Sequence, residues 1–235
     1  MLVLALDTSS PAVSAALVAL SPDGVAQLVA QRVVVDGRRH GELLAGGVQE
    51  VLAAAGREAV GAIVVGTGPG PFTGLRVGLV TAAALSDALG VPAYGICSLD
   101  AVAPQGHVAV VTDARRREVY WARYRDGTRL EGPGVATPAD VAAHLSTVTS
   151  LTDRFAAPDL PVLVGAGAVL HRAAFGAFEV HAEHLHPEPL ELVRCASAQV
   201  LSGAPADPLT PLYLRRPDAA EPSRPKSVLL PRTPR

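Results

Sequence analysis

The stretch GTGPGPFTGLRVG, residues 66–78, follows the apolar run AIVV (62–65) and leads into the apolar segment LVTAAALSDAL. A strand, a glycine-rich turn and a helix in this order are typical of phosphate-binding loops. A Walker loop needs a lysine inside the turn, and the only lysine of this chain is the distant Lys226. The dinucleotide pattern G-x-G-x-x-G also fails, because Pro71 and Thr73 occupy the positions where its third glycine would stand. The stretch therefore predicts strand, turn and helix, and it disfavours a phosphate cradle.

The glycines of this stretch have a helical spacing. Gly70, Gly74 and Gly78 recur every four residues, so the last two share one face of a helix over 73–89. A glycine inside a helix costs about 1 kcal/mol relative to alanine, and a close backbone approach is the compensation we expect. The helix carries only two charged residues, which indicates burial on more than one side. One side would face a sheet, and the other a second helix or another chain.

The helix predicted over residues 40–55 has a similar composition, because Gly46-Gly47 lies in its middle. Two helices with small residues can pack closely and leave a surface of low relief beside them. This pattern is open to two interpretations, internal packing alone or a helical dimerisation surface. We favour the dimerisation surface.

Composition limits the class of protein. The chain has 235 residues, of which 49% are apolar, and a formal net charge of −2, which argues against a surface that broadly coats nucleic acid. The two cysteines stand outside any CxxC pair, so a disulfide framework or a structural zinc site is disfavoured. No apolar run reaches membrane-spanning length and no signal-peptide pattern opens the chain. We therefore expect a cytoplasmic protein with no membrane partner.

The order of the predicted elements indicates an α/β fold with mixed sheets in two lobes. Three meandering strands, then helix, strand, helix and strand, fill residues 1–105. The pattern restarts in 106–216, a smaller and less regular lobe, where HVAVVTDA (107–114) ends in an aspartate as LVLALD (2–7) does. This restart suggests an internal duplication. Proline and basic residues dominate 217–235, which predicts a disordered tail.

Two short segments are candidates for nucleotide binding. Asp7, Thr8 and Ser9 close the first strand, at the place where sugar-kinase and actin-like folds hold a phosphate and its metal. Gly165 and Gly167 flank a single alanine after a later strand and suit a turn on the adenosine side. Ordinary strand-to-helix turns are the alternative interpretation, and we favour it.

Other polar clusters are weaker candidates, and the sequence predicts no catalytic residue, no metal site and no cofactor. His181, His184 and His186 form a cluster that a metal could use, but a solvated loop is favoured because prolines flank it. The arginines of 115–117 fit a solvated turn, with a contact to a phosphate backbone as the alternative.

Several segments, taken in order, resemble the TsaB (YeaZ) family, from Leu2 to about Arg216. GPGPFTGLRVG is highly specific for that family, and the other segments add weight by their order. These segments are LALDTSS, His40-x-Glu42-Leu43, DARRREVYWA and PLYLR.

The resemblance implies an actin-like (ASKHA, ribonuclease H-like) two-lobe fold with a reduced second lobe. It also implies a non-catalytic scaffold subunit that binds and activates TsaD, which transfers threonylcarbamoyl to N6 of adenosine 37 in tRNAs reading codons that start with A. The ATPase TsaE would join the complex, the chain would form a homodimer through similar surfaces, and tRNA would be met indirectly. TsaD binds metal through two histidines spaced by four on its first helix, whereas here His40 is followed by Leu44.

By the same resemblance, the helices 40–55 and 73–89 would dock against the matching helices of TsaD. A double change, Gly74→Leu with Gly78→Leu, is then expected to abolish TsaD binding while the chain still folds. The implied interface residues are His40, Leu43, Leu44, Gly47, Gly70, Phe72, Thr73, Gly74, Arg76 and Gly78. The rival hypothesis is a stand-alone nucleotide-binding ATPase or metallopeptidase-like enzyme of the actin fold, and the missing histidine pair disfavours the latter.

Overall fold

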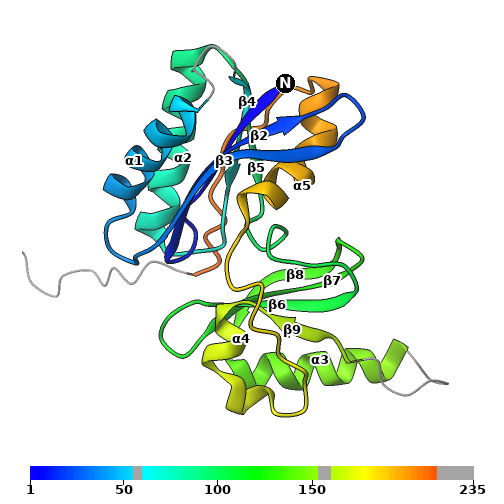
Figure 1. Ribbon diagram of the computed structural model, residues 1–235. Coiled ribbons are helices and arrows are strands. Elements are labelled where there is room, and N and C mark those ends of the chain that lie inside the picture. The colour runs from blue at the N-terminus through cyan, green and yellow to red at the C-terminus, as the bar shows by residue number, and fades with distance from the viewer. Residues whose placement is uncertain (55–59, 153–159, 216–235) are drawn as a thin grey trace, which may run out of the picture.

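The computed structural model describes residues 1–54, 60–152 and 160–215. It contains two sheets, each with its own helices, joined near residue 100 (Figure 1). The elements are β1 (Leu2–Asp7), β2 (Ala12–Leu20), β3 (Ala26–Val35), α1 (His40–Ala53), β4 (Val60–Gly66), α2 (Phe72–Leu89), β5 (Ala93–Ile96), β6 (His107–Asp113), β7 (Val119–Arg125), β8 (Thr128–Ala136), α3 (Pro138–Thr152), β9 (Val162–Val164), α4 (Ala166–Leu170), the 3₁₀ helix η2 (Arg172–Phe175) and α5 (Pro189–Ser202).

The first lobe is a five-stranded mixed sheet in the order β3-β2-β1-β4-β5. β1, β2 and β3 form an antiparallel meander, whereas β4 and β5 run parallel to β1. The central strand β1 is apolar along its length because both of its faces are covered. Leu4 and Leu6 pack on the side of α1 and α2, and Val3 and Ala5 pack on the side of α5. Figure 1 shows α1 and α2 on one side of this sheet and α5 on the other.

The second lobe repeats the first with one strand fewer. Its order is β8-β7-β6-β9, with two antiparallel pairs and one parallel pair, which matches β3-β2-β1-β4. Asp113 ends β6 as Asp7 ends β1, in agreement with the duplication suggested by the sequence. The mixed sheets, their order and their helices make this an α/β actin-like fold, as predicted.

One predicted boundary is corrected by the packing of α5. The sequence placed residues 106–216 together in the second lobe, yet Leu192, Val193 and Ala196 of α5 are buried against the first sheet. The segment just before α5 lies beside the linker between the two lobes, where the Glu188 amide donates to the Ala101 carbonyl at 3.0 Å. This placement follows from the need to cover the second apolar face of the first sheet, so α5 belongs to the first lobe.

Two elements in the region that looked irregular were also missed. β8 is an edge strand that carries a glycine–proline–glycine run, Gly132 to Gly134, and such residues are tolerated at a sheet edge. α3 begins after Thr137, whose Oγ1 accepts a bond from the Asp140 amide at 3.2 Å. The predicted tail 217–235 and residue 55, where the first predicted helix ends, lie outside the described residues.

Among the described residues, α2 is the one helix that is long and apolar enough to cross a membrane by length and composition. Core helices of soluble proteins pass the same test, and α2 buries Leu75, Leu79 and Ala82 within the molecule. It ends at Leu89, and the next residue, Gly90, has a φ of 66°, the left-handed conformation usual just after a helix.

Candidate functional site

Asp7 is fully buried at the carboxyl end of β1 and its carboxylate is already bonded on both oxygens. Oδ1 accepts from the Ser9 amide at 2.8 Å and the Ser9 hydroxyl at 2.7 Å. Oδ2 accepts from the Ser98 hydroxyl at 2.6 Å. Burial raises the pKa of this carboxyl, and the hydrogen bonds from Ser98 and Ser9 oppose that rise. Because it is buried and both of its oxygens accept hydrogen bonds, Asp7 holds the loop that follows β1 in place.

Thr8 joins that loop to α2. Its hydroxyl donates to the Gly74 carbonyl at 2.7 Å and accepts from the Gly78 amide at 3.0 Å. A methyl group built on Gly74 would lie 2.6 Å from the Thr8 carbonyl oxygen, and one on Gly78 would lie 2.5 Å from the Thr8 hydroxyl oxygen. A methyl group on Gly70 would collide with the Ser9 carbonyl. The glycines therefore let α2 approach the β1–β2 loop.

This geometry corrects the role that the sequence suggested for the glycine stripe. The close approach is made by the chain's own loop, so Gly70, Gly74 and Gly78 face inward and are not available to a partner helix. The Gly74→Leu and Gly78→Leu double change would place two large side chains against Thr8. We therefore no longer expect that double variant to fold.

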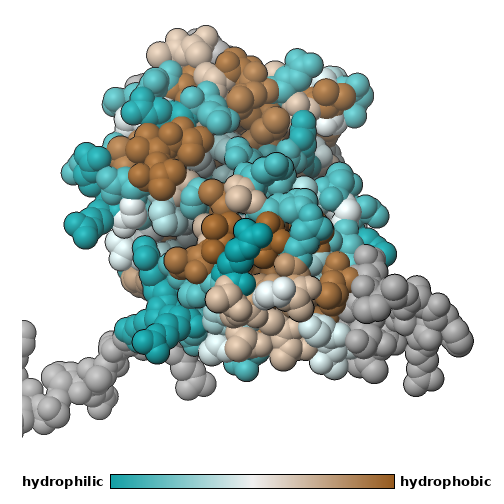
Figure 2. Space-filling view, turned by 60° about the horizontal axis from the view of Figure 1, so that its bottom comes forward, coloured by the Kyte–Doolittle hydropathy of each residue, from teal (hydrophilic) through white to brown (hydrophobic). Residues whose placement is uncertain are grey.

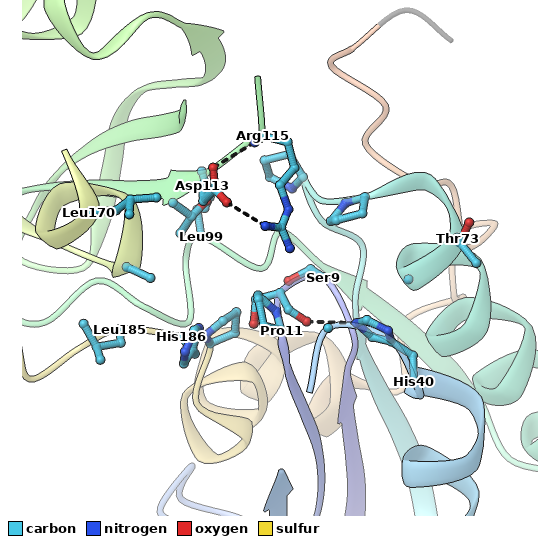
Figure 3. A pocket seen from close by; sticks show the side chains of 18 of the residues that line it. Ser9, Pro11, His40, Thr73, Leu99, Asp113, Arg115, Leu170, Leu185 and His186 are labelled. Atoms are coloured by element: carbon cyan, nitrogen blue, oxygen red, sulfur yellow. Dashed lines mark hydrogen bonds and ion pairs between the residues drawn. The ribbon is translucent and has the colours of Figure 1, made fainter. Parts of the chain in front are cut away.

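A cleft of about 520 Å³ lies between the two lobes (Figure 3). Ser9 and Ser10 line it from the first lobe, and Thr112 and Asp113 line it from the second. Arg115 extends from the second lobe into the space between them, and Asp113 holds it by accepting from its amide at 2.8 Å. Asp7 is not among the lining residues.

The other candidate nucleotide segment borders the same cleft from the second lobe. Gly165 has a φ of 100°, and a methyl group there would collide with the Val111 carbonyl. A methyl group on Gly167 would lie 2.7 Å from the carbonyl carbon of Thr112. Both glycines thus allow the start of α4 to touch β6. Ala166 between them lines the cleft opposite Ser9, so the fold does bring the two candidate segments to one cavity.

The predicted interface residues on and beside α1 and α2 fall into three groups by their solvent exposure. Phe72, Thr73 and Arg76 are exposed, His40 and Leu43 are half-buried, and the remaining five are buried. Leu44 is 1% exposed and belongs to the core, and Gly47 packs on Ala15 and the stem of Arg32. The buried residues are Leu44, Gly47, Gly70, Gly74 and Gly78.

Val80, which is not among the predicted interface residues, is also exposed on this surface, with a relative exposure of 64%. It lies in a shallow groove along α2 that runs between Phe72 and Thr81. The spacing contained a signal for it, because Arg76, Val80 and Ala84 also recur every four residues. They are offset by two positions, about 200°, from the inward glycines, and so point outward. The exposed positions of α1 include Ala45 and Gly46, both small.

The comparisons with known proteins agree with one another. Residues 34–159, a little over half of the chain, match the family model described as TsaD: tRNA N6-adenosine threonylcarbamoyltransferase. The tRNA threonylcarbamoyladenosine biosynthesis protein TsaB of Escherichia coli is 35% identical over 135 residues, covering 53% of this chain and 55% of that protein. YeaZ from Pseudomonas aeruginosa matches in structure with a TM-score of 0.68 and 27% identity, covering 91% of this chain and 100% of that chain.

This chain belongs to the TsaB (YeaZ) family. An uncharacterized protein of Mycobacterium tuberculosis is 47% identical over 221 residues, which is 92% of this chain and 93% of that protein. The TsaB family takes part in the biosynthesis of threonylcarbamoyladenosine in tRNA.

The first helix of this TsaB-family chain does not present a histidine pair. His40 has its Nε2 atom 3.2 Å from the Ser10 carbonyl, and the residue four positions later is the buried Leu44. In the later histidine cluster, His181 pairs with Glu179 at 2.7 Å while His186 lines the interlobe cleft. Within residues 1–54, 60–152 and 160–215, no group of three or more His, Cys, Asp or Glu side chains is arranged to hold a metal ion.

Proposed function

We propose that this protein is a non-catalytic subunit of the machinery that makes threonylcarbamoyladenosine in tRNA, and that it binds and activates a TsaD-type transferase through the outer surface of α1 and α2. The observation that carries the proposal is the outward row on α2, where Val80 is 64% exposed in a shallow groove. An exposed apolar side chain on a helix of low relief suits a second helix packed against it.

Two further features of the α1 and α2 surfaces support a helix as the occupant. Ala45 and Gly46 are small exposed residues of α1, which would let a partner backbone come close to that helix. Arg76 lies over the Phe72 ring at 5.1 Å and gives the end of the groove a fixed shape and a positive charge. A groove with an apolar centre and a charged end is the usual composition of a protein interface.

Two features of the site support the non-catalytic role. Asp7, the residue at the phosphate position of actin-like folds, is buried and bonded to Ser9 and Ser98. Leu44 stands in the core where a second metal-binding histidine would be needed. We therefore expect calorimetry of the full-length protein with ATP and Mg²⁺ to give no binding heat. Micromolar binding would favour the rival hypothesis of an ATPase.

The remaining parts of the proposal concern the assembly. The ATPase TsaE joins the complex, the free chain forms a homodimer through the same α1–α2 surface, and tRNA is met mainly through the assembly. All of this takes place in the cytoplasm. Because both dimers use one surface, the TsaD-type partner competes with the homodimer.

The docking surface is tested with a matched pair of variants, Val80→Asp and Leu170→Asp. Val80 and Leu170 are 64% and 63% exposed, so neither change disturbs packing, but Leu170 lies on α4 of the second lobe. Each full-length variant is mixed with the TsaD-type protein of the same organism and analysed by size exclusion with light scattering. We expect Val80→Asp to lose the heterodimer and Leu170→Asp to keep it.

Thermal unfolding of both variants serves as the control for folding. A heterodimer that survives Val80→Asp at wild-type affinity would overturn the proposed docking surface. The same chromatography on the chain alone reports the homodimer, which Val80→Asp is expected to dissociate.

A further inference from the structure

A second cavity, of about 720 Å³, lies where the start of α2, the turn between β6 and β7 and the segment 211–215 meet. Pro71, Phe72, Tyr120 and Tyr213 line it together with arginines from the turn and from the segment. A cavity of this size and apolar character is within the usual range for small-molecule sites. We call it the Tyr213 pocket.

The aromatic wall of the pocket is built in advance. The rings of Phe72 and Tyr213 are stacked with their centroids 4.9 Å apart, and Arg76 lies over Phe72 at 5.1 Å. The Phe72 ring therefore supports Tyr213, which is still 42% exposed and offers ring surface to solvent. Tyr120, only 4% exposed, is held with its hydroxyl 3.5 Å from the Gly70 carbonyl.

The segment that carries Tyr213 is fixed at both ends. The Leu212 amide donates to the Thr67 carbonyl at 2.9 Å. Arg215 donates to the Ala114 carbonyl at 2.8 Å and pairs with Glu118 at 2.8 Å. Because the segment is held before any ligand arrives, little conformational entropy is lost on binding.

The turn between β6 and β7 presents three consecutive arginines in a costly conformation. Arg115, Arg116 and Arg117 have φ of 63°, 52° and 63°, and left-handed geometry costs a non-glycine residue about 1–2 kcal/mol. All three side chains are exposed. Positions that hold such geometry are concentrated where proteins bind ligands, so the turn points to a function for these side chains.

The charge around the pocket contrasts with that of the whole chain. Arg115, Arg116 and Arg215 line the pocket and Arg76 lies over its Phe72 ring, so four positive charges stand against the two carboxylates of Asp113 and Glu118, a local excess of two. The chain as a whole has a net charge of −2. A local excess of this kind attracts a polyanion to one place on an otherwise acidic protein.

We propose that the Tyr213 pocket binds a nucleotide unit of single-stranded RNA, with a base stacked on Tyr213 and the adjoining phosphates held by Arg115 and Arg116. The inference deepens the proposed function, since it assigns to this chain a direct contact with the RNA that the machinery modifies. Stacked bases and arginine-bound phosphates together are the usual chemistry of single-stranded RNA recognition. An acidic peptide would use the arginines but leave the aromatic wall without a flat partner.

Binding is measured by fluorescence anisotropy of a labelled ten-nucleotide RNA with the full-length protein at low salt. Arg115→Asn with Arg116→Asn removes two charges from the lining of the pocket, and asparagine tolerates the left-handed turn. Tyr213→Leu removes the stacking surface. The control is Arg194→Gln, which deletes an exposed arginine on α5, across the first sheet from α2 (Figure 1). The arginine changes do not replace residues that line the α2 groove, so heterodimer formation should survive in them. Tyr213→Leu removes the ring stacked on Phe72, which does line that groove, so this variant is judged by RNA binding alone.

We expect the double asparagine variant and Tyr213→Leu each to weaken RNA binding about ten-fold, in line with one lost stack or two lost phosphate contacts. The slope of log affinity against log salt should fall by about 1.4 in the double variant, at about 0.7 for each phosphate contact in single strands. Arg194→Gln should bind as the wild type does.

Two competitors identify the source of the ligand. Free AMP should displace the RNA only at concentrations far above that of unlabelled RNA; displacement at equal concentration would overturn RNA as the ligand in favour of a free nucleotide. Polyglutamate of equal charge should compete poorly. Competition as strong as that of unlabelled RNA would overturn RNA as the ligand in favour of an acidic peptide. No RNA binding by the wild type, or equal loss in Arg194→Gln, would also overturn the proposal, whatever the heterodimer assay shows.

Discussion

Gly46 and Gly78 are both glycines inside a helix, but their surroundings differ completely. A methyl group on Gly46 would meet nothing within 4 Å, whereas one on Gly78 would lie 2.5 Å from the Thr8 hydroxyl oxygen. That hydroxyl cannot move aside, because it bonds Gly74 and Gly78 at once. We expect Gly46→Ala to stabilise the protein by about 0.5–1 kcal/mol. We expect Gly78→Ala to destabilise it by about 1–3 kcal/mol through overpacking.

Urea unfolding of the two variants checks this pair, with equal m-values as the sign that only stability has changed. Similar effects of both substitutions would contradict the inward role of Gly78. Gly46→Ala thus measures the conformational cost of a glycine in a helix, and Gly78→Ala measures the need for a glycine where the packing leaves no room for a side chain.

Asp7 makes the stability of the fold depend on pH. Burial raises the pKa of its carboxyl above the ordinary value of 3.8, so the folded state holds a proton more tightly than the unfolded state. The stabilising contribution of this group is therefore present below pH 3.8 and is lost as pH rises through the raised pKa. Asp7→Asn keeps the shape but remains neutral. We expect the unfolding free energy of Asp7→Asn, relative to the wild type, to rise with pH across this window.

Urea unfolding of both proteins at several values between pH 4 and pH 7 measures that difference. If the unfolding free energy of Asp7→Asn instead fell relative to that of the wild type as pH rises, the hydrogen bonds from Ser9 and Ser98 would outweigh the cost of burying the charge.

At the scale of elements, α5 has the clearest test, because two of its leucines differ in burial. Leu192 is fully buried against the first sheet, while Leu201 is 38% exposed. Leu192→Ala should cost about 2–5 kcal/mol through lost burial and the cavity left behind. Leu201→Ala should cost well under about 1 kcal/mol, as expected of a surface position. Chemical denaturation measures both, and similar costs would contradict the packing of α5 on the first lobe.

The elements also show which parts of the fold could be read from the sequence. Long apolar runs predicted β1, β4 and β6, and the helices predicted over 40–55 and 73–89 are α1 and α2. The start of α3 was missed although Thr137, Pro138 and Asp140 are standard residues for a helix N-terminus. β8 was hidden because its proline and glycines contradict ordinary strand composition.

The candidate site was less predictable for a physical reason. Spacing alone showed that Gly74 and Gly78 share one face, but not which neighbour that face meets. Only the tertiary packing places the Thr8 loop there and turns Val80 outward. Similarly, Tyr213 is far from Arg115 in sequence, and the two meet because the segment after α5 returns to the turn before α2, where the Leu212 amide bonds the Thr67 carbonyl.

At the scale of the whole molecule, the path of the chain makes the first lobe depend on a helix that follows the second lobe in sequence. The first sheet is complete by residue 96, yet one of its faces is covered only by α5, at 189–202. A fragment of residues 1–105 would expose that apolar face, which includes Val3, Ala5 and Val64. We expect this fragment to bind a hydrophobic dye and to lack a cooperative unfolding transition, as expanded compact states do.

A fragment in which residues 1–103 are joined to 187–204 by a short flexible linker should behave differently. The junction is short in space, because the Glu188 amide lies 3.0 Å from the Ala101 carbonyl. The hydroxyl of Tyr94 also donates to the Ala204 carbonyl at 3.0 Å, which fixes the far end of the added helix. With α5 restored, the face is covered again and a cooperative urea transition should return. If residues 1–105 alone unfolded cooperatively, α5 would be dispensable, and the second lobe would be an appendage of a self-sufficient first lobe.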